Sequence, residues 1–309
     1  SNNKFRLVTR SDFDGLGCAV LLKQLDLIEE IKFVHPKDMQ DGTVLISKSD
    51  ITTNLPYVEG VHLAFDHHSS EITRVEEKYR NHIIDPHAPS TTRVVYDYYG
   101  GRDKFPNVKE EMMEAVDKGD SAQFTLDEIL KPGGWALLNY LMDSRTGLGR
   151  FREFRISNYQ LMLQLIDYCR DHNVDEILEL PDVAERVELY FEQEDKFKDQ
   201  LKRCTKVVSN LALLDLREEK IIFAGNRFMI YALYPETNIS IHVPWGLNRL
   251  NTVFAVGKSI VNQTSNTDIG ELMLKHGGGG HANAGTCQIE NVDADRVLKK
   301  LREQINADG

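Results

Sequence analysis

Acidic side chains and histidines recur in short clusters in the first part of the chain. The candidate clusters follow apolar runs, at positions where a strand or a helix is predicted to end. They are Asp12 with Asp14, then Asp50, the triplet Asp66-His67-His68, and Asp117 with Asp120. Carboxylates mixed with one or two imidazoles suit Mn²⁺ or Mg²⁺ better than zinc or copper. The residue types therefore predict a site for hard divalent cations.

Such cations do a specific kind of chemistry. Two of them about 3.5–4 Å apart can share a bridging hydroxide, direct it at phosphorus and stabilise the developing charge. Asp12-Phe13-Asp14-Gly15 alone is weak evidence, because a solvated turn explains it better, and Asp50 alone indicates nothing. The triplet Asp66-His67-His68 is more informative, because an acid and two imidazoles are costly to hold at the end of a buried strand without a ligand. The clusters together favour metal-assisted hydrolysis of a phosphoester or phosphoanhydride.

A second candidate feature is a run of four glycines that precedes His281. Consecutive glycines leave their backbone N–H groups unobstructed. Gly278, Gly279 and Gly280 could therefore cradle phosphate oxygens, with a further hydrogen bond from His281. This is not a Walker loop, because no Gly-Lys-Ser/Thr follows. A flexible loop is the alternative interpretation.

Short apolar runs predict the strands that position the first clusters. They lie at 4–8, 31–34, 43–47, 61–65 and 82–84, separated by Pro, Gly, Asp and Asn. Strands of this kind suit a mainly parallel, doubly wound sheet, which binds ligands at the carboxyl ends of its strands. From about 90 to 170 the apolar spacing predicts a helical insert.

The second half of the chain predicts a smaller, mixed α/β domain. The charged stretch 182–204 keeps helical spacing and predicts a linker helix. Strands are expected at 205–214, 221–224, 228–234, 239–243, 251–260 and 284–289, with helices at 268–275 and 293–305. The chain is thus expected to be α/β, with a metal-binding catalytic domain at 1–181, a linker at 182–204 and a substrate-binding domain at 205–309.

Composition limits the function classes. The 309 residues include 37 Lys and Arg against 48 Asp and Glu, which gives a net charge of −11. This charge argues against tight binding of long duplex nucleic acid, which needs a basic footprint. No apolar run approaches the ~20 residues of a membrane span, and four scattered cysteines form no CxxC pair. We expect a cytoplasmic protein that acts on a short anionic substrate, and its oligomeric state, including a homodimer, stays open.

The motifs in this order resemble those of the DHH phosphoesterase superfamily. Asp-x-Asp-Gly stands near the N-terminus, Asp-His-His at 66–68 and GGGGHANAG at 277–285. The resemblance is to the branch with a C-terminal DHH-associated domain and covers nearly the whole chain. It implies an N-terminal catalytic domain and a C-terminal domain that binds substrate. The superfamily includes oligoribonucleases, exopolyphosphatases, pyrophosphatases, exonucleases and cyclic-dinucleotide phosphodiesterases.

The resemblance also implies a set of ligands for two Mn²⁺ ions, with Mg²⁺ as the alternative. Asp12 would bind the first ion, Asp14 the second, and Asp50 would bridge them. His67 would be a further ligand of the second ion. The stretch DSAQF resembles the family's Asp-Thr-x-x-Phe pattern and makes Asp120 the ligand of the last motif.

Further residues would act on the substrate. The resemblance places His68 at the scissile phosphate, where it would stabilise or protonate the leaving oxygen, with Asp66 supporting the metal shell. The glycine run with His281 would clamp the substrate. Asp117 stays the alternative to Asp120 as the ligand.

Arg10 departs from the family pattern, which usually has a histidine ahead of the Asp-x-Asp pair. A guanidinium cannot bind a cation. Arg10 could hold a substrate phosphate instead, the site could use one tightly bound metal, or catalysis could be impaired. A non-catalytic nucleotide-binding protein is therefore one alternative.

The substrate class is open in a second respect. We expect hydrolysis of terminal phosphoester bonds in an oligoribonucleotide or in 3′-phosphoadenosine 5′-phosphate. Arg150, Arg152 and Arg155 could instead bind an inorganic chain, because arginine recognises phosphate through its planar fork. An exopolyphosphatase or pyrophosphatase is therefore the alternative enzyme. Ion pairs within the protein are the other interpretation of these arginines.

Overall fold

A computed structural model describes residues 3–309. The chain divides into two units, and each is described by itself. The first unit contains the residues up to Phe124 together with Pro132–Ser144 and Phe151–Glu188. The second contains Thr125–Lys131, Arg145–Arg150 and Leu189–Gly309. Two short segments of the expected catalytic domain thus belong to the second unit.

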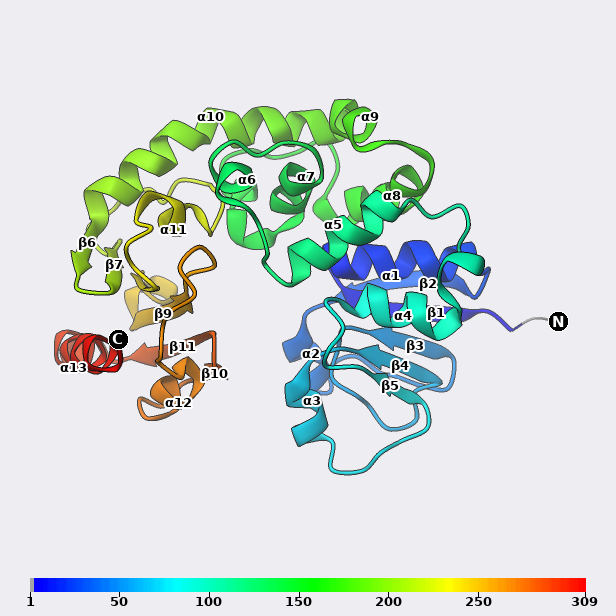
Figure 1. Ribbon diagram of the computed structural model, residues 1–309, viewed down its shortest axis with the longest axis horizontal. Helices are drawn as coiled ribbons and strands as arrows, with labels where there is room; N and C mark the ends of the chain where they lie inside the picture. Colours follow the sequence, from blue (N-terminus) through cyan, green and yellow to red (C-terminus); the bar gives the residue numbers. More distant parts are fainter. Residues whose placement is uncertain (1–2) are drawn as a thin grey trace. The chain divides into compact units, whose positions relative to one another are not determined.

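The first unit is built on a five-stranded, wholly parallel sheet (Figure 1). The strands in spatial order are β2 (Ile28–Val34), β1 (Phe5–Arg10), β3 (Asp50–Thr53), β4 (Leu63–Asp66) and β5 (His82–Ile84). Their carboxyl ends all lie at one edge. The expected α/β class with a parallel sheet is confirmed.

Both faces of this sheet are covered. On one face, helices α1 (Phe13–Gln24) and α4 (Thr91–Tyr99) contact each other, and the Phe65 ring of β4 packs against Tyr98 and Tyr99. On the other face, Val8 packs in a cluster with Met39 of α2 (Pro36–Gln40) and with Leu55. Helix α3 (Ser69–Arg74) follows β4. Burial on both faces explains the apolar runs in β1 and β4.

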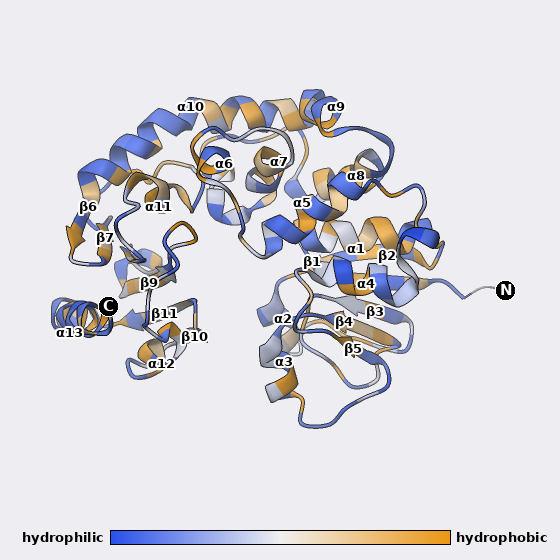
Figure 2. Ribbon diagram, in the orientation of Figure 1, coloured by the Kyte–Doolittle hydropathy of each residue, from blue (hydrophilic) through white to orange (hydrophobic). Residues whose placement is uncertain are grey.

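The segment of the chain that connects the first sheet to the second contains further helices. They are α5 (Glu110–Asp120), α6 (Leu126–Leu130), α7 (Gly134–Met142), α8 (Asn158–Asp171), α9 (Val174–Glu179) and α10 (Pro181–Cys204), with 3₁₀ turns at Gly101–Asp103, Ser144–Thr146 and Leu148–Arg150. Hydrophobic and hydrophilic residues alternate along α10 (Figure 2). This helix spans the segment for which the sequence predicts a linker. Across residues 3–309, no helix is both long and apolar enough to cross a bilayer.

The expected strand at 43–47 is wrong. This segment is irregular, and the strand begins later, at Asp50. Val44 and Ile46 are apolar because they pack from a loop against the Val8 cluster, not because they belong to the sheet. Asp50 therefore begins a strand, whereas the sequence analysis expected it to follow one.

The second unit contains a six-stranded mixed sheet. Its strands in spatial order are β10 (Gly279–His281), β11 (Ala284–Ile289), β9 (Thr252–Lys258), β8 (Ile239–Val243), β7 (Leu211–Asp215) and β6 (Thr205–Val208). Strands β7 and β8 are parallel and the other pairs are antiparallel. Its core joins this sheet to α12 (Ile269–Leu274) and α13 (Ala294–Asp308).

Two strand predictions for this unit are wrong. Residues 221–224 form no strand, and 228–234 contain helix α11 (Met229–Leu233) instead. A continuous apolar run fits a buried helix as well as a buried strand, so periodicity alone could not separate them. Short 3₁₀ turns lie at Leu247–Arg249 and Asn291–Asp293.

Candidate active site

Asp12 lies in the turn from β1 into α1, at the carboxyl edge of the first sheet. Its Oδ1 accepts a hydrogen bond of 2.8 Å from the N–H of Gly15, which caps the helix. A Cβ at Gly15 would lie 2.0 Å from the carbonyl oxygen of Arg10, so the turn requires glycine there. This tight turn places Asp12 and Asp14 beside the strand end.

Asp14 is buried at the start of α1 and is anchored by the start of α4. Its carboxylate accepts hydrogen bonds from the N–H groups of Thr91 and Thr92, at 3.0 and 2.8 Å, and from the Thr92 hydroxyl at 2.7 Å. Burial, reinforced by the charges of Asp120 and Asp12, raises the pKa of Asp14 to about 7. A cation beside Asp14 would remove much of this cost.

His67 follows β4 and approaches Asp120, the last residue of α5. Its Nδ1 lies 3.0 Å from the carbonyl oxygen of Ala88, and its Nε2 lies 2.7 Å from Asp120 Oδ2. Nδ1 therefore donates to Ala88, which leaves Nε2 to face the carboxylate. That approach is an ion pair without the alignment of a hydrogen bond. Burial lowers the pKa of His67, but Asp120 outweighs it and raises the pKa to about 9.

These residues fit the requirements of a divalent cation. Asp14, His67 and Asp120 each offer one ligand atom, and the three atoms lie within 4.8 Å of one another. Two carboxylates and an imidazole are a suitable donor set for Mn²⁺ or Mg²⁺. The hydrogen bond from Nδ1 to a carbonyl is the arrangement that orients metal-binding histidines. This cluster is the candidate cation site.

Asp66 and His68 form a separate pair beside this cluster. Asp66 is 2% exposed, and its Oδ1 lies 2.6 Å from Nδ1 of His68 and accepts a hydrogen bond of 2.8 Å from the N–H of His67. The hydrogen bond to Asp66 raises the pKa of His68. The His68 side chain is 40% exposed, so its ring is held by a buried acid while remaining accessible. The pair has the form of an oriented proton donor.

Asp117 lies one helical turn before Asp120 but has other partners. It accepts a hydrogen bond of 2.7 Å from the Ser90 hydroxyl and two from the guanidinium of Arg93, at 3.0 and 2.7 Å. Of the two candidates for the last motif, the structure brings Asp120 to the cluster and ties Asp117 to the start of α4.

Asp50 lies away from the candidate site. It pairs in register with Arg6, and Arg6 donates to its two oxygens at 2.7 and 3.2 Å. The N–H of Ser47 also donates to it, at 2.8 Å. Asp50 is thus at the amino end of β3, whereas Asp12, Asp14 and His67 lie at the carboxyl ends of β1 and β4. The family resemblance implies that Asp50 bridges two cations, and this position at the amino end of β3 does not fit that role.

Asn54, which the sequence analysis did not single out, lies at the carboxyl end of β3. It is 2% exposed, and neither side-chain amide atom has a hydrogen-bond partner within residues 3–309. Its φ of +61° is left-handed, and its N–H donates to the carbonyl oxygen of Phe65. An unpaired buried amide costs about 1–3 kcal/mol, which indicates a site for a ligand. No strand was predicted to end at residue 53, where β3 ends, so the sequence offered no signal for Asn54.

Arg10, the last residue of β1, provides positive charge at the same edge. Its Nε lies 3.6 Å from Oδ2 of Asp12, and the two side chains are 37% and 35% exposed. The guanidinium is thus accessible to an anionic ligand. The pair also places a cationic side chain beside one of the expected metal ligands.

The glycine run in the second unit is not a loop throughout. Strand β10 pairs antiparallel with β11, and a Cβ at Gly278 would lie 2.1 Å from the carbonyl oxygen of Thr286. Gly279 has open space at the corresponding position. His281 is exposed and its Nδ1 accepts a hydrogen bond of 3.3 Å from the N–H of Asn283. Close backbone packing explains part of the glycine content, and Gly279, Gly280 and His281 present an exposed strand.

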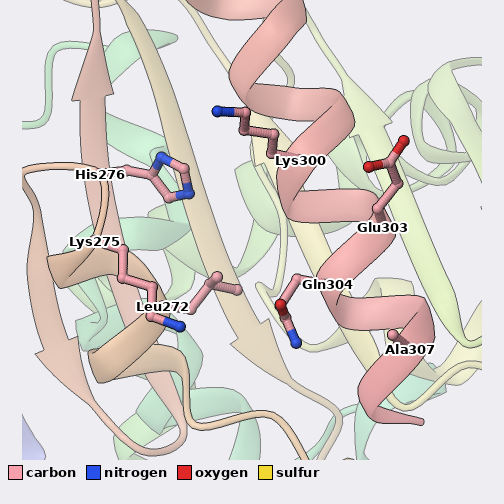
Figure 3. A pocket seen from close by; sticks show the side chains of 7 residues that line it. All are labelled: Leu272, Lys275, His276, Lys300, Glu303, Gln304 and Ala307. Carbon is pink, nitrogen blue, oxygen red and sulfur yellow. The ribbon is translucent and has the colours of Figure 1, made fainter.

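A cavity in the second unit involves none of these candidates. Its volume is about 370 Å³, and Figure 3 shows Lys275, His276, Lys300 and Glu303 among the residues that line it, between α12 and α13. Nearby positive charges and burial lower the pKa of His276, with burial the larger effect. Because the lining carries both signs of charge, this cavity is not a focused anion site.

Comparison with known proteins identifies the class. No family model matches the chain. PggH of Vibrio cholerae, a solved structure described as a pGpG-specific phosphodiesterase, is 64% identical, with a TM-score of 0.88; the match covers 99% of this chain and 100% of that one. A DHH domain described as a member of the s1p family of ribosomal proteins is 12% identical, with a TM-score of 0.63, over 98% of this chain and 87% of that one. The second match shows the fold alone.

A curated relative matches a smaller part. The A-adding tRNA nucleotidyltransferase of Aquifex aeolicus is 27% identical over 111 residues, which are 34% of this chain and 13% of that protein. The chain thus spans a small part of this relative's length. The relationship to PggH covers both proteins almost completely. The chain belongs to the DHH superfamily, as the motifs predicted, and it is a hydrolase of the phosphoesterase type.

Proposed function

We propose that this protein hydrolyses the phosphodiester bond of pGpG, a linear dinucleotide, to give two mononucleotides. The observation that carries the proposal is the 64% identity to the pGpG-specific phosphodiesterase PggH over 99% of the chain. A dinucleotide with a terminal phosphate also belongs to the expected class of short anionic substrates. The proposal narrows the oligoribonucleotide prediction to its shortest member.

The candidate site supports this chemistry residue by residue. Asp14, His67 and Asp120 would hold the cation, which when bound polarises the scissile phosphoryl group and makes an attacking water more acidic. His68, held through Nδ1 by Asp66, would donate a proton from Nε2 to the leaving oxygen. In this proposal the exposed His68 ring of the pair delivers the proton to the substrate.

Groups that bind the substrate complete the proposal. Arg10 would contact phosphate oxygens through its guanidinium. In the second unit, the exposed strand of Gly279, Gly280 and His281 would offer backbone N–H groups to phosphate oxygens. Gly278 would support this strand, since its own position is closely packed.

The arginines that favoured an inorganic chain have partners within the protein. Arg150 donates to the carbonyl oxygen of Ile222 at 3.1 Å, and Arg152 to that of Glu185 at 3.4 Å. The guanidinium of Arg155 pairs with both carboxylate oxygens of Asp182. These contacts support the interpretation that the three arginines make interactions within the protein. Polyphosphate is therefore less well supported as the substrate than a dinucleotide.

The test is a side-by-side assay of substrates. The purified protein is given Mn²⁺ or Mg²⁺ and one of pGpG, pApA, 3′-phosphoadenosine 5′-phosphate, polyphosphate or pyrophosphate, and products are separated by chromatography. We expect GMP from pGpG, little product from the others, and no product from Asp14→Asn. Turnover of polyphosphate by a folded protein that leaves pGpG intact would overturn the proposal. Comparing the two metals at equal concentration decides the preferred cation.

A further inference from the structure

The candidate site has donors for one cation but few for a second. Asp12 already caps α1 and lies 3.6 Å from a guanidinium. Asp66 uses one oxygen for the N–H of His67 and for the ring of His68. Asp50, an obvious further carboxylate by sequence, is paired with Arg6 at the opposite edge of the sheet. A second cation would thus lack a set of available carboxylates.

Arg10 places a permanent positive charge where that second cation would have to bind. Its guanidinium shares the Asp12 carboxylate and would repel a divalent ion there. The same guanidinium can bind phosphate oxygens, which a cation would otherwise neutralise. Arg10 therefore opposes the binding of a second ion while providing the same sign of charge.

Asn54 is the neighbour of Arg10 across the sheet. Thr9 of β1 pairs with Thr53 of β3, so Arg10 and Asn54 stand one residue beyond that pair. The amide of Asn54 is buried and unpaired among the described residues, although its backbone is held by Phe65. A neutral amide is a poor substitute for a bridging carboxylate, but it can donate to a phosphate oxygen.

We propose that each chain binds one divalent cation, on Asp14, His67 and Asp120, and that Arg10 with Asn54 replaces a second cation by contacting the substrate phosphate directly. The positive charge at the carboxyl end of β1 is then part of the protein. The site would bind phosphate with one exchangeable ion. This deepens the proposed function, because it assigns the phosphate contact of that same site.

The first experiment counts bound metal. Mn²⁺ is titrated into the metal-free protein, and free ion is measured by electron paramagnetic resonance. We expect one ion per wild-type chain and none at the same affinity in Asp120→Asn. The double variant Arg10→His/Asn54→Asp supplies an imidazole and a carboxylate, and we expect it to bind two ions with a spin-coupled spectrum. Arg102→His, which adds a histidine at an exposed position of the same unit, should still bind one.

Each result of the count of bound metal ions either supports or contradicts the proposal. Two ions in the wild type would overturn the proposal, and so would a folded double variant that binds only one. Circular dichroism and a melting curve establish folding of the variants. If the double variant does not fold, the wild-type count and a second, kinetic measurement still test the idea.

The kinetic measurement uses Arg10→Gln with pGpG. We expect KM to rise at least ~10-fold, the loss of a charge-assisted phosphate contact, while the Mn²⁺ count stays at one. An unchanged KM would contradict the role of Arg10. This measurement rests on the proposed function, whereas the metal count does not. Failure to hydrolyse pGpG would therefore overturn the proposed function and leave the one-cation inference to be decided by the count.

Discussion

Nε2 of His67 lies 2.7 Å from Oδ2 of Asp120, which joins the end of β4 to the last residue of α5. The third member of the cluster, Asp14, comes from the start of α1. Each ligand is at the end of a different secondary-structure element, and Ala88 fixes the imidazole by accepting from Nδ1. The helical insert thus supplies one of the three donors, so the site depends on how α5 packs on α1 and α4.

Asp120→Asn tests this cluster, with Asp117→Asn as the matched control on the same helix. We expect Asp120→Asn to lower kcat/KM by about 100-fold or more and to weaken Mn²⁺ binding, since a ligand is lost. Its melting temperature reflects two opposing changes, because the charge beside Asp14 is removed and the ion pair with His67 is lost. Asp117→Asn should keep Mn²⁺ affinity but lose about 1–3 kcal/mol of stability, because it breaks the contacts with Ser90 and Arg93. The reverse pattern would assign the ligand to Asp117.

The pair Asp66 and His68 predicts a non-additive loss of activity. Asp66→Asn and His68→Asn should each lower kcat by about 100-fold, since both remove an oriented proton donor. The double variant should be little worse than either single variant, because the two residues act as a unit. Mn²⁺ affinity of His68→Asn should change by less than about threefold. If the kcat losses of the two single variants multiply in the double variant, Asp66 acts independently of His68.

For Asp50 we predict that substitution lowers the stability of the protein without lowering its catalytic activity. Asp50→Asn breaks a mostly buried ion pair, so we expect the free energy of unfolding to fall by about 2–4 kcal/mol. kcat and Mn²⁺ affinity of the folded fraction should stay within about twofold of wild type. Urea unfolding and a pGpG assay at low temperature measure both. A loss of metal binding at full stability would instead restore the role that the motif resemblance implied.

Much of the first unit follows from its sequence, because apolar runs buried on both faces are a strong signal. The end of β4 was predicted closely, and with it the position of the residues from Asp66 to His68. Asp50 was misplaced for a physical reason: Val44 and Ile46 are apolar through loop packing, which periodicity cannot distinguish from a strand. A shift of one strand start moved the carboxylate to the opposite edge of the sheet.

Asn54 and the glycine run show what sequence alone could not provide. The importance of Asn54 lies in its burial and its unpaired amide, which depend on the neighbouring strands. The four glycines looked alike in sequence, yet Gly278 is packed against β11 and Gly279 has open space. Differences of this kind arise from tertiary contacts, and residue type does not encode them.

His242 on β8 predicts a pH-dependent stability of the second unit. The residue stands in register with Leu214 of β7 and Ala255 of β9, and burial lowers its pKa to about 4. The unfolded chain, with a pKa near 6.5, binds the proton first. Stability is therefore complete above about pH 6.5 and falls as the pH drops toward 4, by up to about 3 kcal/mol. Melting curves at pH 7.5 and 5 should differ less for His242→Gln than for wild type; equal differences would contradict this assignment.

Gly278→Ala and Gly279→Ala separate packing from substrate binding in the glycine run. A Cβ at Gly278 would lie 2.1 Å from the Thr286 carbonyl oxygen and 2.7 Å from the Cβ of Cys287, so β10 must move away from β11. We expect Gly278→Ala to lose about 2 kcal/mol or more of stability. A Cβ at Gly279 meets nothing within 4 Å, so this variant should lose less than about 1 kcal/mol. Because Gly279 is exposed beside His281, its methyl group should instead raise KM for pGpG. An unchanged KM in Gly279→Ala would show that this strand does not bind the substrate.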